Sequence, residues 1–211
     1  MKNILFAGPS LYGLDLLQLI PNDWVVRPPI RRGDMDTLRF PPKEGGAVHI
    51  VDGTFHVFPA VGHKEIISAI KRGWEVTGLA SLGAIRASEL RDFGMQGFGQ
   101  VYQQYIEHPE FRDDEVTQIH MSTPPYNPIS EPLINIRDYL AFMVGSGRIS
   151  KNTHDEIIKL FSSMWYGNRT LSLLKKLLET KGSDFNNQDF TACRVKQRDV
   201  RHYFLQKELY L

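Results

Sequence analysis

Two consecutive strand-to-helix units constrain the fold of this chain more than any other feature. One apolar run (AVHIVDGTF) precedes a helical pattern that begins near Lys64, and a second (WEVTGL) leads into another that follows Ser81. Two strands joined by a helix imply a right-handed parallel crossover. Because open α/β sheets bind ligands where their strands end, we expect Lys64 and Ser81 to surface at one edge of a sheet.

The remaining pattern extends this unit into an α/β half and a helical half. After the first apolar run, LYGLDLLQLI spaces its leucines helically, and beyond Phe98 helical patterns dominate. We therefore predict the fold class α/β, with a parallel-type sheet and flanking helices in the N-terminal half and a mainly helical C-terminal part. The expected strands cover residues 3–7, 24–27, 47–51 and 75–79, and the first two clear helices cover 64–72 and 84–92.

Composition excludes several classes of protein. The 211 residues carry a formal net charge of +1, which gives no general electrostatic reason to expect nucleic acid or an anionic membrane as a partner. The single cysteine, Cys193, excludes an intramolecular disulfide framework and a cysteine-rich metal site. The N-terminal apolar run is too short for a signal sequence, and no stretch approaches a membrane span, so we expect a soluble, cytoplasmic protein.

Ser81 and Lys64 are the candidate catalytic pair. A neutral lysine amine can take the proton of a serine hydroxyl, and the positive end of a helix favours the neutral amine. Small residues surround Ser81 in GLASLGAIRA, so backbone N–H groups could approach a substrate oxyanion there. A helix-capping role for Ser81 and a solvated first turn around Lys64 remain open alternatives. Ser10, at the end of the first predicted strand, is the alternative nucleophile, although an N-cap of the following helix is the preferred interpretation of this serine.

Other residues are candidates for supporting or substrate-binding roles. Asp52 ends a predicted strand at the same edge, where it could orient a lysine or an arginine, and a turn-forming Asp-Gly explains it almost as well. The arginine fork suits recognition of a carboxylate or a protein C-terminus. These candidates are Asp52, His63, Arg86, Arg31 and Arg32.

The acidic segment DDEVTQIH, residues 113–120, raises the question of a metal. Its spacing matches no zinc or EF-hand motif. An acidic helix start or an interface is the preferred interpretation, and we predict no metal and no organic cofactor.

Several sequence blocks, taken in order, resemble the TfuA-like family. They are GPSL, PPIRRGDM, VDGTF, AVGHKEI, ASLGAIRASEL, FGMQGFGQVYQQY, DDEVTQIH and SEPLINIR. The resemblance covers about residues 8–137, so we expect a TfuA-like α/β core at 1–137 and a helical extension at 138–211, packed on the same domain. Gly62 departs from the family pattern, which usually has a bulky aromatic residue before HKE.

The resemblance implies a function in peptide thioamidation, for a ribosomal peptide natural product or for protein modification. TfuA-like proteins are understood to assist a YcaO enzyme and to release sulfide from a thiocarboxylated, ThiS-like sulfur carrier with a Ser-Lys pair. Carried over to this chain, the lysine is Lys64 and the serine is Ser81, with Ser10 retained as the alternative. Expected partners are a YcaO-type enzyme and the carrier, with the precursor peptide as an open further partner. The competing hypothesis is a non-catalytic adaptor that docks carrier or peptide onto YcaO.

Overall fold

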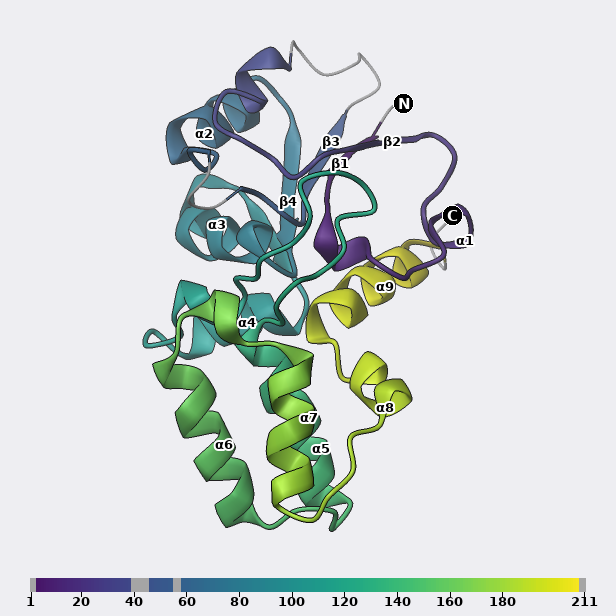
Figure 1. The fold of residues 1–211 in the computed structure, drawn as a ribbon. Helices are drawn as coiled ribbons and strands as arrows, with labels where there is room; N and C mark the ends of the chain where they lie inside the picture. The colour runs from purple at the N-terminus through teal and green to yellow at the C-terminus, as the bar shows by residue number, and fades with distance from the viewer. Residues whose placement is uncertain (1–2, 39–45, 55–57, 209–211) are drawn as a thin grey trace. The chain divides into compact units, whose positions relative to one another are not determined.

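A computed structural model describes residues 3–38, 46–54 and 58–208 (Figure 1). Residues 1–111 and 199–211 form one compact unit, and residues 112–198 form a second. The boundary near residue 137 that we expected from the family resemblance stays a prediction. No helix in the described part of the chain is long and apolar enough to cross a membrane.

The first unit is built on a five-stranded sheet in which every neighbouring pair of strands is parallel. The strand order is β2-β1-β3-β4-β5, with β1 at Asn3–Phe6, β2 at Trp24–Arg27, β3 at Ala47–Ile50, β4 at Glu75–Leu79 and β5 at Gln96–Phe98. The predicted α/β class and parallel sheet are confirmed. Strand β5 was not predicted, because three residues with a central glycine give too short a pattern to indicate a strand.

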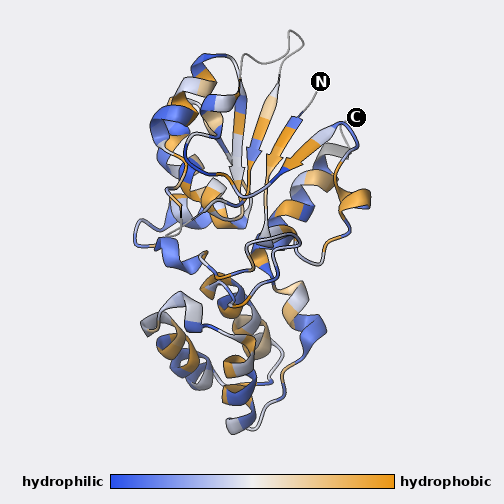
Figure 2. Cartoon of the chain, turned by 45° about the horizontal axis from the view of Figure 1, so that its top comes forward, coloured by the Kyte–Doolittle hydropathy of each residue, from blue (hydrophilic) through white to orange (hydrophobic). Residues whose placement is uncertain are grey.

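The apolar strands lie between two layers of helices. Helices α2 (His63–Lys71) and α3 (Leu82–Leu90) cover one face of the sheet, and the end of α9 (Val195–Glu208) lies with α1 (Leu16–Leu19) at the other (Figures 1 and 2). The residues at this second face form a buried cluster that includes Leu5, Leu79, Val200, Tyr203 and Phe204. Most of the energy that holds the sheet comes from this burial on both faces.

Two glycines allow α3 to pack directly on the sheet. A Cβ atom added at Gly83 would lie 1.7 Å from the carbonyl oxygen of Ile50, and one added at Gly78 would lie 1.9 Å from the carbonyl oxygen of Gly83. No side chain larger than hydrogen fits either position. The small residues around Ser81 therefore bring the start of α3 close to the ends of β3 and β4.

The leucine-rich segment after β1 is less helical than its spacing predicts. Only Leu16–Leu19 forms an α-helix, preceded by a short 3₁₀ turn at Pro9–Leu11. Gly13 adopts a φ of +79°, and the Asp15 side chain caps the N–H groups of Leu17 and Gln18. The helix therefore starts late, and Pro21 follows its end after a single residue.

A buried aspartate from α9 caps helix α4 (Gln100–Glu107). Asp199 accepts hydrogen bonds from the N–H groups of Gln100 (2.8 Å) and Val101 (2.9 Å). Gly99, the N-cap residue, has a φ of +94°, and an added Cβ would lie 2.4 Å from the Asp199 carboxyl carbon. A glycine is thus required at position 99, both by the backbone conformation and by the close approach of the Asp199 carboxylate.

Replacing Asp199 with alanine is expected to lower the free energy of unfolding by about 1–3 kcal/mol, because two N–H donors lose their buried acceptor. Urea denaturation measures the change. Asp92→Ala, at an exposed carboxylate of the same unit, is the matched control and should change stability by less than about 0.5 kcal/mol. Equal effects of the two substitutions would contradict the capping role.

The second unit is helical, as predicted. It contains α5 (Leu133–Gly145), α6 (Lys151–Ser163), α7 (Leu171–Thr180) and α8 (Asn187–Ala192). Its core consists of buried apolar side chains from all four helices, including Ile136, Tyr139, Phe161, Leu174 and Phe190. Cys193 belongs to the same core. Burial raises the pKa of the Cys193 thiol to about 11, so the thiol stays protonated near neutral pH.

Candidate active site

The candidate residues gather at one edge of the sheet because the strand register aligns them. Phe6 pairs with Ile50 in register, and Ile50 pairs with Gly78. The chain continues from these aligned positions to Ser10, Asp52 and Ser81 respectively. The connection from β1 leads to β2 on one side, whereas β3 lies on the other, so β1 and β3 form the switch point at which doubly wound sheets bind ligands.

Ser81 follows a strained turn. The Ser81 N–H donates to the carbonyl of Leu79 at 2.8 Å, which closes a γ-turn around Ala80, and Ala80 has a φ of +65°. A γ-turn of this kind is rare, and a non-glycine residue in it carries backbone strain. Such strain concentrates at functional sites. Here the turn determines the orientation of Ser81, which immediately follows Ala80.

The Ser81 hydroxyl is not used to cap its own helix. Ser81 is the N-cap residue of α3 and only 4% exposed, yet its side chain makes no cap hydrogen bond. Nor does its Oγ bond to any other residue within the described ranges. The N–H of Gly83 is occupied by the carbonyl of Val51 (3.2 Å), but that of Leu82 has no acceptor among the described residues. A hydroxyl beside an unused helix N-terminal donor is suited to acyl chemistry.

Ser10 is bound by an acid instead. Its Oγ donates to Asp52 Oδ1 at 2.7 Å, and the N–H groups of Ser10 and Gly8 both donate to Asp52 Oδ2 at 2.9 Å. Ser10 and Asp52 are each 2% exposed. Asp52 therefore binds the turn after β1 through three hydrogen bonds. These hydrogen bonds orient the turn and keep the Ser10 hydroxyl engaged as a donor to the Asp52 carboxylate.

Lys64 lies in the first turn of α2 with its side chain exposed. No hydrogen bond joins Lys64 Nζ to Ser81 Oγ, and no carboxylate of the described residues pairs with the ammonium. The turn itself is fixed by the next residue, because Glu65 accepts from the N–H of Gly62 (2.6 Å) and from that of Gly33 (2.8 Å). The start of α2 is thus rigid, while the Lys64 side chain remains free to reorient.

Glu89 connects the two remaining candidates on α2 and α3. It lies 2.8 Å from His63 Nε2 and 2.7 Å from Arg86 Nη1. Arg86 Nε also donates to the carbonyl of Val61 at 3.0 Å. The Arg86 guanidinium therefore holds the chain just before α2. Arg31 and Arg32, by contrast, are exposed.

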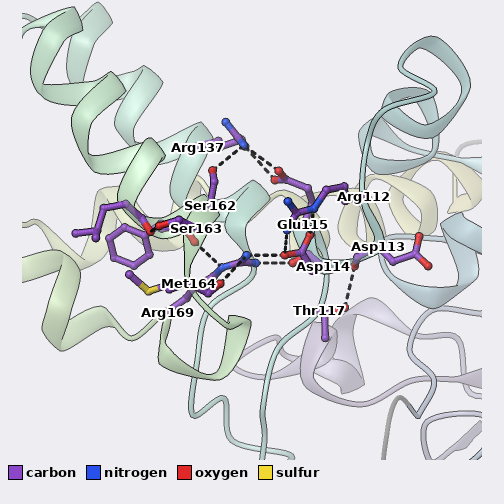
Figure 3. A network of polar contacts seen from close by, with 12 residues as sticks. Arg112, Asp113, Asp114, Glu115, Thr117, Arg137, Ser162, Ser163, Met164 and Arg169 are labelled. Carbon is purple, nitrogen blue, oxygen red and sulfur yellow. Dashed lines mark hydrogen bonds and ion pairs between the residues drawn. The ribbon is translucent and has the colours of Figure 1, made fainter.

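The acidic DDEV segment belongs to an ion-pair network in the second unit (Figure 3). Asp114 binds Arg112 and the fully buried Arg169, while Glu115 makes two hydrogen bonds of 2.9 Å to Arg137. Burial disfavours the Asp114 carboxylate, but the hydrogen bonds from the two arginines outweigh it and lower its pKa. Within residues 3–38, 46–54 and 58–208, no group of three His, Cys, Asp or Glu side chains could hold a metal ion.

A comparison with protein families matches residues 52–170 to the family described as TfuA-like protein. The match covers more than half of the chain. The chain belongs to the TfuA-like family. A comparison with curated proteins found no match. The matched region of this TfuA-like protein contains Asp52, Lys64 and Ser81, whereas Ser10 and Arg31 precede it.

Three features of this edge were not predicted from the sequence: the second hydrogen bond of Glu65, the role of Glu89 and the strain at Ala80. Glu65 stands at the third helical position after Gly62, which is the spacing of a capping box, but its bond to Gly33 depends on tertiary structure. Glu89 follows Arg86 by three positions, a spacing that brings helical side chains together. The strain at Ala80 had no sequence signal, because alanine is not typical of a positive φ.

Proposed function

We propose that this TfuA-like protein hydrolyses a thiocarboxylated, ThiS-like sulfur carrier and delivers the sulfide to a YcaO enzyme for peptide backbone thioamidation. The observation that carries the proposal is Ser81, presented after a strained turn at the sheet edge with a hydroxyl that no described residue engages. Family membership supports the same reaction class.

The chemistry needs a nucleophile and a proton acceptor. Ser81 Oγ attacks the thiocarboxylate carbon, and its proton passes to the Lys64 amine. The C–S bond then breaks, sulfide leaves and carries away that proton, and the carrier remains as an ester on Ser81. Water cleaves the ester, which regenerates Ser81 and releases the carrier as a carboxylate. The Leu82 N–H and the positive end of α3 stabilise the tetrahedral oxyanion.

This proposal requires Lys64 to turn toward Ser81 when substrate binds. Catalytic hydrogen bonds are often absent before substrate binding and form in the complex. The exposed Lys64 side chain, unpaired among the described residues, is suited to such a movement. The lack of a Ser81–Lys64 hydrogen bond is also the observation that favours the second candidate, a non-catalytic adaptor that docks carrier or peptide onto YcaO.

Sulfide release by the purified protein alone separates the two functions. Incubated with thiocarboxylated carrier and no YcaO, the wild type is expected to release sulfide, and Lys64→Ala to release it at least about a hundredfold more slowly, since it lacks the general base. Lys71→Ala, at an exposed lysine of the same helix, is the matched control and should keep the full rate. Wild-type release no faster than carrier alone would contradict the hydrolase and favour the adaptor.

A further inference from the structure

Residues 58–62, here called the strap, run into the start of α2 and are fixed by hydrogen bonds. Arg32 donates to two consecutive strap carbonyls, with its backbone N–H at 3.0 Å and its Nε at 3.3 Å. Arg86 donates to the next carbonyl at 3.0 Å. Because these bonds hold backbone groups, the side chains along the strap have defined positions.

Two cationic side chains, those of Arg31 and Arg32, lie along the strap. The Arg31 guanidinium carbon lies 4.1 Å from the centroid of the Phe58 ring, at the start of the strap. Arg32 Nη2 lies 3.9 Å from where a Cβ at Gly62 would be, at its end. Both arginines are exposed. Phe58 is itself 45% exposed, so an apolar ring lies among the charges.

The nearby carboxylates bind other groups. Glu65 accepts from two backbone N–H groups, Glu89 binds Arg86 and His63, and Asp34 accepts from the Arg31 backbone N–H at 2.7 Å. Among the described residues, no ion pair involves the side chain of Arg31, Arg32 or Lys64. Within the described part of the chain, the strap therefore presents positive charge without a contacting counter-ion, and such a surface attracts an anion.

We propose that Arg31, Arg32 and Phe58, together the strap surface, bind the flexible C-terminal tail of a partner protein that ends in a carboxylate or thiocarboxylate. The proposal rests on the proposed function, because it makes this tail the carrier's reactive end. The arginine fork pairs with two oxygens, and an exposed aromatic ring packs against an extended backbone. Gly62 leaves space beside Arg32 in which a family-typical aromatic side chain would lie.

Binding of a short fluorescent peptide tests the strap surface without any hydrolysis. The peptide with a free C-terminal carboxylate is expected to bind at least about tenfold more tightly than its C-terminal amide, which corresponds to about 1.4 kcal/mol. Arg31→Ala should remove most of this preference, whereas Arg91→Ala, at an exposed arginine outside the strap, should keep it. Among the described residues, the Arg31 side chain makes no hydrogen bond or ion pair and stacks on the exposed Phe58 ring, so the thermal midpoint should not change.

Kinetics with the thiocarboxylated carrier distinguish this inference from the proposed function. Arg31→Ala should raise KM about tenfold and leave kcat unchanged, because it removes binding that substrate and transition state share. If the wild type releases no sulfide, the proposed hydrolase function is contradicted, whereas the peptide-binding experiment still tests the strap surface. Equal binding of the acid and amide peptides, or unchanged binding by Arg31→Ala, overturns the inference.

Discussion

Replacing Arg169 with alanine is expected to lower the free energy of unfolding by about 3–5 kcal/mol. Arg169 is fully buried and makes four hydrogen bonds, two to Asp114 and two to the carbonyls of Phe161 and Met164 (Figure 3). Removing the guanidinium takes one hydrogen-bond donor from each of these acceptors and creates a cavity. The substitution should therefore unfold much of the second unit under mild denaturant.

Arg112→Ala is the matched control for this prediction. Arg112 binds the same Asp114 carboxylate, but its side chain is 63% exposed. Exposed pairs contribute little, so its loss should cost less than about 1 kcal/mol. The buried Cys193 supplies a second readout, because its thiol should react with alkylating reagents only on unfolding. A cost for Arg112→Ala equal to that for Arg169→Ala would show that burial does not decide the stability of this network.

The network also predicts a pH dependence. The folded-state pKa of Asp114 is lowered, so the unfolded chain takes up the proton first as the pH falls. The stabilisation is fully present above the ordinary aspartate pKa of about 4 and is lost as the pH falls through the lower, folded value. Asp114→Asn should flatten the fall in unfolding free energy over this acid range.

Replacing Ser81 with alanine is expected to reduce sulfide release at least about a thousandfold, because alanine cannot form the ester through which the proposed reaction proceeds. The protein should remain folded, since the Ser81 side chain makes no cap hydrogen bond that alanine would lose. Ser88→Ala, on the same helix, removes a hydroxyl bonded to the carbonyl of Ile85 and should keep the rate within a few fold.

Ser10→Ala separates the two candidate nucleophiles. Its hydroxyl already donates to Asp52, so its loss should lower stability by about 1 kcal/mol and leave release nearly unchanged. If Ser10→Ala abolished release and Ser81→Ala did not, Ser81 would be the wrong nucleophile.

The sheet and the position of the candidate residues could be predicted from the sequence. Apolar runs ending at Ala7, Val51 and Leu79 determine the strands, and parallel pairing brings the residues that follow them to one edge. The partners of those residues could not be predicted. The Ser10–Asp52 contact joins residues 42 positions apart, and the Asp199 cap joins residues 98 and 99 apart, so no local pattern records them.

Local conformation limited the prediction in other ways. Leucine spacing predicted a long helix after β1, but Gly13 and the Asp15 cap delay the helix until Leu16. The strained φ of Ala80 arises because the chain must turn sharply between β4 and α3, whose glycines place them in backbone contact. That constraint comes from packing, so alanine propensity gave no indication of it.

Mass analysis of the quenched reaction tests the central claim most directly. Purified protein is mixed with thiocarboxylated carrier, stopped in acid within one turnover and digested, and the peptide joined to the carrier's C-terminus is identified. The account predicts a transient ester on Ser81, absent from Ser81→Ala and depleted in Lys64→Ala, whose serine lacks its base. An ester on Ser10, or sulfide release with no ester on Ser81 at any time during the turnover, would contradict it.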